Sequence, residues 1–103
     1  MFELQAPETV CQVLGARVRA LRLARNLTQD EMARMCGVSL SSVRRLESNG
    51  QGSLLLWVQV AQALNATDTL ESLFAVPVQS IAQAEGAALA ASRQRARNAR
   101  RKV

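Results

Sequence analysis

Two helix-start signals lie 11 positions apart within residues 27–47, and they constrain the fold more than any other feature of the sequence. Thr28 followed by Glu31 has the pattern of a capping box, in which each side chain accepts a hydrogen bond from the other residue's backbone N–H. Gly37 supplies the left-handed conformation that ends a helix, and Ser39 is suited to capping the next one. Two helices joined by so short a turn must meet at a sharp corner.

Helices are also predicted before and after this pair. Pro7 is tolerated in the opening turn of a helix, so a first helix should begin at residues 7–9 and run to about residue 25. Ser53 can cap a fourth helix. Helical spacing predicts the buried stripes of these two helices: Val10, Leu14, Val18 and Leu21 in the first, and Leu54, Trp57, Val60, Ala61 and Leu64 in the fourth.

A short fifth helix is predicted near residue 70. Asp68 with Glu71 has the pattern of another capping box, which would open this helix. The helix should carry Leu70, Leu73 and Phe74 and end before Pro77.

The composition changes after residue 78. Residues 79–103 are rich in alanine and arginine and contain few large apolar side chains, so they cannot build a core of their own. The predicted organisation is therefore one all-α domain, residues 1–78, followed by a basic and flexible C-terminal tail, residues 79–103.

The positive charge is unevenly distributed. Six of the 13 basic residues lie in the last 11 positions, and the other seven all lie within residues 17–45. The body of the chain is therefore close to neutral in sum but locally basic, which is compatible with a polyanion-binding face.

The residue inventory argues against an enzyme and against a metal centre. The chain has no histidine and no tyrosine, its single lysine is Lys102, and no glycine-rich phosphate loop is present. Cys11 and Cys36 lack metal-ligand spacing, and Cys36 is expected to be a buried core thiol. We expect no cofactor and no metal. Without a signal peptide or a long apolar run, a cytoplasmic protein that does not enter a membrane is expected.

The corner between the two helices is typical of a helix-turn-helix, whose second helix enters the major groove of DNA. The segments "RALRLARNLTQDEMA", "GVSLSSVRRLES" and "LLLWVQVAQALN" together resemble the Cro/C1-type (XRE-family) repressor domain over residues 14–73. The resemblance implies a compact five-helix, lambda-repressor-like domain whose recognition helix spans about residues 39–48.

The resemblance also implies which residues contact DNA. Gln29 matches a phosphate-contacting glutamine, and Asn49 matches a backbone contact after the recognition helix. Base-edge contacts are matched by Leu40, Ser41 and Arg45. The rim of that surface is matched by Ser39 and Arg44. An arginine can donate two parallel bonds to guanine O6 and N7. The alternative for Arg44 and Arg45 is a solvated helix face or a sequence-independent phosphate contact.

The resemblance implies two further features, an ion pair and a dimer surface, and each has an alternative interpretation. Arg22 and Glu47 match positions at which relatives hold a partly buried ion pair, although two ordinary surface charges would fit the sequence as well. Such domains bind DNA as twofold dimers, and the candidate dimer surface consists of Leu70, Leu73, Phe74, Val76 and Val78. These residues could instead cover the other helices.

The role of the basic tail and the function of the chain each have more than one interpretation. The basic tail residues Arg93, Arg95, Arg97, Arg100, Arg101 and Lys102 could form a disordered, solubilising end or an arm that neutralises DNA phosphates. The leading prediction is a repressor that binds a palindromic operator as a homodimer. A HipB-like antitoxin that restrains a HipA-type kinase toxin is the alternative, and an RNA- or membrane-binding module driven by the tail is the third.

Overall fold

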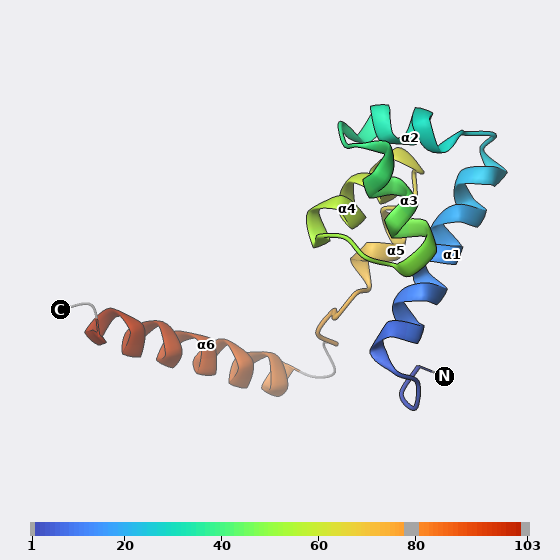
Figure 1. Cartoon of the computed structure of the whole chain (residues 1–103). Helices are drawn as coiled ribbons and strands as arrows, with labels where there is room; N and C mark the ends of the chain where they lie inside the picture. Colours follow the sequence, from blue (N-terminus) through green and yellow to red (C-terminus); the bar gives the residue numbers. More distant parts are fainter. Residues whose placement is uncertain (1, 78–80, 102–103) are drawn as a thin grey trace. The chain divides into compact units, whose positions relative to one another are not determined.

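The computed structural model describes residues 2–77 and 81–101, and within the second range it describes the side chains of residues 85–97. All regular secondary structure within these residues is helical, and the predicted all-α class is confirmed. The helices are α1 (Pro7–Ala24), α2 (Gln29–Cys36), α3 (Leu40–Asn49), α4 (Leu54–Ala63), α5 (Asp68–Glu71) and α6 (Ile81–Arg101) (Figure 1). The chain divides into two compact units, Met1–Leu73 and Phe74–Val103.

The capping box at the start of α2 is present. The Thr28 hydroxyl accepts a hydrogen bond from the Glu31 N–H at 3.0 Å, and the Glu31 carboxylate accepts one from the Thr28 N–H at 3.0 Å. The hydrogen bond from the Thr28 backbone, followed by that from its side chain, lowers the pKa of Glu31. Gly37 ends the helix with φ of 67°, in the left-handed region. The predicted start and end of α2 are therefore confirmed.

The next two helices also begin at the predicted serines. The Ser39 hydroxyl accepts from the Ser42 N–H at 3.1 Å, and the Ser53 hydroxyl accepts from the Leu56 N–H at 3.1 Å. Each bond satisfies one of the backbone donors that a helix start leaves without an internal partner. Local chemistry thus fixes where α2, α3 and α4 begin.

Close contact through two glycines sets how α1 lies against α3. A Cβ built on Gly15 would lie 2.3 Å from the Leu46 carbonyl oxygen. Gly50, with φ of 68°, follows α3, and a Cβ on it would lie 2.0 Å from the Cys11 carbonyl oxygen. Backbone therefore approaches backbone at both points, which only glycine allows.

This contact corrects the predicted stripe of α1. The buried residues of α1 are Gly15, Val18 and Arg22, whereas Leu21 is 44% exposed. With Gly15 turned toward α3, helical geometry turns residues three and seven positions later to the same side and leaves residue 21 outside. The prediction that Leu21 is buried was wrong.

The stripe of α4 is also shifted from the prediction. Leu56, Val60 and Leu64 are buried at spacings of four residues, while Leu54 is 68% exposed. The start of α4 is an unbroken apolar run. Such a run has no alternation of apolar and polar residues, so it does not indicate which face of the helix is buried. The expectation for Leu54 was wrong, and Leu56 was missed.

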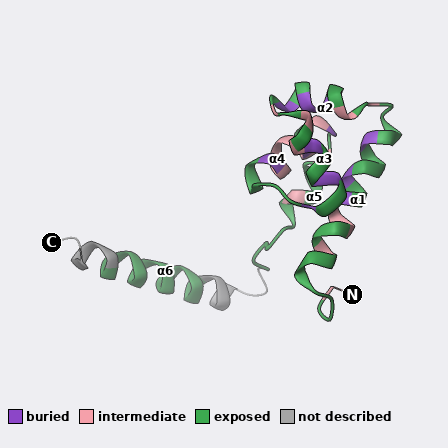
Figure 2. Ribbon diagram, in the orientation of Figure 1, coloured by how far each residue is buried: buried purple, intermediate pink, exposed green. Residues whose placement is uncertain are grey.

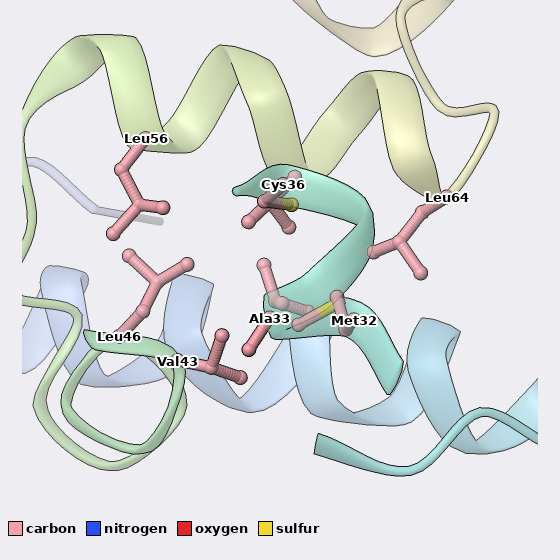
Figure 3. Packing of buried hydrophobic residues seen from close by; sticks show 9 residues of the cluster. Met32, Ala33, Cys36, Val43, Leu46, Leu56 and Leu64 are labelled. Carbon is pink, nitrogen blue, oxygen red and sulfur yellow. The ribbon is translucent and has the colours of Figure 1, made fainter. Parts of the chain in front are cut away.

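The core is formed by α2, α3, α4 and the residue that follows α4, with one residue from α1. Its buried apolar side chains are Val18, Met32, Ala33, Cys36, Val43, Leu46, Leu56, Val60 and Leu64. Figure 3 shows the labelled side chains of α2, α3 and α4 converging on one another. Burial raises the pKa of the Cys36 thiol, as expected for a core cysteine.

The fifth helix differs from its prediction at both ends. It covers only Asp68–Glu71, and its N-cap is Thr67, which has helical dihedral angles and makes no side-chain cap. The predicted capping box is therefore wrong, because Asp68 is already the first helical residue. Leu73 and Phe74 lie beyond the helix, and Phe74 adopts φ of 52°. The chain therefore leaves the helix well before Pro77.

The segment after residue 80 is a single helix, α6. Alanine and arginine are strong helix formers, which accounts for a helix that the prediction of a flexible tail does not include. All described side chains of α6, residues 85–97, are exposed (Figure 2). No helix within the described residues is both long enough and apolar enough to cross a membrane.

Candidate functional site

The helix α3 has two chemically different faces. Val43, Leu46 and Glu47 point inward and are buried. Arg44 and Arg45 lie between them in sequence and are exposed, because successive residues turn by about 100° around a helix. Packing of the inward face therefore holds two arginines on the outside of the molecule.

The residues that the resemblance placed at a DNA contact lie along α3, at its N-cap and at the first residue of α2. Five of them are exposed, namely Ser39, Ser41, Arg44, Arg45 and Asn49, and two are half-buried, namely Gln29 and Leu40. The Ser39 hydroxyl is engaged in the helix cap and lies 2.8 Å from the Ser42 hydroxyl. The Ser39 hydroxyl therefore serves mainly to cap α3.

A buried ion pair fastens α3 to α1. The Arg22 Nε donates to Glu47 Oε2 at 2.6 Å, and Nη2 donates to Oε1 at 3.0 Å. The side chains are 7% and 2% exposed. Arg22 Nη1 also donates to the Leu27 carbonyl oxygen at 2.7 Å, just before α2. The structure therefore brings together the two residues that the resemblance paired, and places the pair in the interior rather than at the surface.

A third side chain joins this pair. The Gln29 Nε2 donates to Glu47 Oε1 at 3.1 Å. Glu47 thus accepts hydrogen bonds from α1 and α2 while it lies on α3. Sequence reasoning identified Gln29 and Glu47 separately but missed their contact, since no local pattern connects side chains that are 18 positions apart.

A hollow of about 460 Å³ lies beside Arg45. Its lining comes from the turn before α3, from α3 itself, and from the loop and first turns of α4: Val38, Ser42, Arg45, Gln51, Gly52, Ser53, Leu55, Leu56 and Gln59. Leu55 is 67% exposed. Sequence reasoning missed this hollow, because the apolar run of α4 does not show that Leu55 is exposed while Leu56 is buried.

The predicted dimer surface is largely open to solvent in the single chain. Leu70 is half-buried, and Leu73, Phe74 and Val76 are exposed. Val78 lies outside the described residues.

The predicted tail residues are placed in part. Arg93, Arg95 and Arg97 are exposed on α6. Arg100 and Arg101 fall within the last turn of α6, but their side chains lie outside the described residues, as does the whole of Lys102. The described arginines are thus accessible to a polyanion.

A family model described as a helix-turn-helix domain matches residues 13–75. No curated protein matches the chain. The matched region includes both helices of the corner, the buried ion pair and the exposed face of α3.

Proposed function

The chain belongs to the helix-turn-helix domain family, within the Cro/C1-type group, and on this premise we propose that it is a sequence-specific DNA-binding repressor. The helix α3 would enter the major groove as the recognition helix. The observation that carries this proposal is the two-faced character of α3. Its inward face is locked by the core and by Glu47, while Arg44 and Arg45 stand exposed on the other side.

Arg45 is the proposed base-reading residue. Its guanidinium can donate two parallel hydrogen bonds to O6 and N7 of guanine, which is worth about 1–3 kcal/mol of discrimination. Ser41 is less selective, because a hydroxyl can donate or accept. Leu40 offers only an apolar contact, for which a thymine methyl is the matching group. Arg44 would reach the rim of this surface.

Contacts on either side of α3 would fix its register on the duplex. Gln29 opens α2, and Asn49 is the last residue of α3. Both carry amide groups that can donate to phosphate oxygens. Such contacts position a protein on DNA without reading the sequence.

The repressor would act as a homodimer on a palindromic operator. One recognition helix contacts few base pairs, so twofold binding to half-sites one helical turn apart supplies the remaining specificity. Leu73, Phe74 and Val76 support this assembly, because they are exposed and apolar. Sedimentation should show a dimer at micromolar concentration or on DNA. A strict monomer in both conditions would remove the dimer from the proposal.

Selection of bound fragments from a random DNA pool tests the reading of sequence. The native chain should enrich a palindromic motif. Arg45→Ala should bind more weakly and lose preference at one position of each half-site, whereas Arg19→Ala, an exposed arginine of α1, should recover the full motif. Random recovery by the native chain would refute a sequence-specific function.

The antitoxin alternative stays a prediction. It requires a kinase partner in addition to DNA. Co-purification of a kinase with the chain from its native cells would support it, and its absence across growth conditions would leave repression alone.

A further inference from the structure

We propose that Glu47 is a positioning residue for the DNA backbone contact of Gln29. It holds the Gln29 side-chain amide so that an N–H, and not the carbonyl oxygen, is offered to a phosphate. The inference rests on the proposed function, because it concerns how one of its backbone contacts is prepared before DNA arrives.

The Glu47 carboxylate is itself fixed. It is 2% exposed, and both of its oxygens accept hydrogen bonds from Arg22, at 2.6 Å and 3.0 Å. Arg22 is tied in turn to the Leu27 carbonyl oxygen at 2.7 Å. A carboxylate with both oxygens engaged by one guanidinium cannot rotate freely. Glu47 is therefore a rigid acceptor at the point where α1, α2 and α3 meet.

The orientation of Gln29 follows from this acceptor. Its Nε2 lies 3.1 Å from Glu47 Oε1. An ionised carboxylate only accepts hydrogen bonds, so the reversed amide, with its oxygen against Glu47, is unfavourable. One N–H of the amide is used in this bond, and the other stays available. A phosphate oxygen also only accepts hydrogen bonds, so the free N–H of Gln29 is the group that it needs. Because the Gln29 side chain is already held by Glu47, it loses less rotamer freedom when DNA binds.

The negative charge of Glu47 does not prevent a phosphate from contacting Gln29. The negative charge of Glu47 is matched by the bidentate Arg22 guanidinium, so a phosphate approaching Gln29 meets a paired carboxylate. Arg22 thus contributes to the backbone contact indirectly, through Glu47.

A double-mutant cycle separates positioning from a structural role. Arg22→Met/Glu47→Met removes the acceptor while replacing a buried ion pair by apolar side chains, a change that proteins often tolerate. Gln29→Ala is then made in the native chain and in the Met/Met chain. Affinity is measured by anisotropy for one labelled duplex of about 20 base pairs at low salt, where phosphate contacts dominate.

In the native chain, Gln29→Ala should weaken binding about tenfold, as expected for a lost hydrogen bond to a charged acceptor. In the Met/Met chain, the same change should weaken binding by less than about threefold, since an unheld amide loses most of its advantage. Gln12→Ala, at an exposed glutamine of α1, is the matched control and should be neutral in both chains. Equal losses in the two backgrounds, or no loss in the native chain, would overturn the proposal.

This outcome is independent of sequence specificity, because a phosphate contact acts on any duplex. A native chain that bound this duplex without enriching any motif would refute the proposed repressor function and leave the cycle interpretable.

A second measurement needs neither DNA nor the Met/Met variant. Nitrogen-15 relaxation of the side-chain amides should show Gln29 as ordered and the exposed Gln12 as mobile. Equal mobility of the two amides would overturn the proposal, because Glu47 would then not be holding Gln29.

Discussion

The units Met1–Leu73 and Phe74–Val103 are both built from helices, but different forces hold those helices in place. In the first unit, α2, α3 and α4 begin at side-chain caps and bury a face in a shared core. In the second, α6 exposes every described side chain. Its helical state therefore depends on residue propensity, which is weak for an isolated helix.

Two glycines show the same difference at atomic scale. A Cβ on Gly15 would lie 2.3 Å from a backbone oxygen of α3, whereas a Cβ on Gly86 would meet nothing within 4 Å. The first glycine is required by tertiary packing and the second is not. The contrast indicates that the arginines of α3 are placed by the fold as a whole, while those of α6 are placed only by their own helix.

The largest expected effect comes from breaking the buried ion pair of the first unit. Arg22→Ala should lower the free energy of unfolding by about 3–5 kcal/mol, because it leaves the Glu47 carboxylate buried without its partner. The exposed arginines Arg19 in α1 and Arg95 in α6 are the matched controls. Urea unfolding followed by fluorescence of Trp57, the single tryptophan, measures the change. Equal effects at all three positions would contradict the buried role of Arg22.

The glycine contrast gives the next effect. Gly15→Ala should destabilise the first unit by about 2–3 kcal/mol, since α1 and α3 would have to separate to admit the methyl group. Gly86→Ala should leave the Trp57 transition unchanged and increase the helical circular dichroism of the chain, because alanine favours a helix over glycine by about 1 kcal/mol. If both variants were neutral in the Trp57 transition, the close approach of α1 and α3 would be incorrect.

The capping box of α2 predicts a smaller, pH-dependent effect. The folded-state pKa of Glu31 lies below its ordinary value of 4.5, so the unfolded chain binds more protons there and stability falls as the pH drops through the folded-state pKa. Glu31→Gln keeps an oxygen acceptor for the Thr28 N–H but cannot ionise. The native chain should therefore lose more stability than the variant below about pH 4.5. Parallel pH profiles from thermal melts would argue against this contribution.

Truncation after Ser92 should have the smallest effect on the first unit. Its Trp57 unfolding transition should not move, because the described side chains beyond that point are exposed. DNA binding should nevertheless become less salt-dependent, by up to about 5 in the log–log slope if all six lost basic residues contact phosphates. Anisotropy over a series of salt concentrations measures this slope, and an unchanged slope would remove the tail from DNA binding.

The features of the fold that could be predicted from sequence are those set by local chemistry. Thr28, Ser39 and Ser53 each cap a helix within three residues, so their roles are readable from neighbouring positions. The family match likewise agrees with the helix-turn-helix that these starts predicted.

The features that could not be predicted depend on contacts between distant segments. The exposure of Leu21 follows from the approach of Gly15 to α3, and the phase of α4 is hidden by its continuous apolar run. The hydrogen bond from Gln29 to Glu47 joins two helices and leaves no local trace in the sequence. At α5, the helical conformation of Thr67 overrode the capping pattern of Asp68.

The central claim is that α3 enters the major groove with Arg45 against a base edge, and methylation protection tests it most directly. Dimethyl sulfate modifies N7 of guanine in the major groove and N3 of adenine in the minor groove. With the enriched duplex, the native chain should protect N7 of one guanine in each half-site, and Arg45→Ala should restore its reactivity while other protections persist. Protection confined to adenine N3, or a pattern unchanged by Arg45→Ala, would contradict this account.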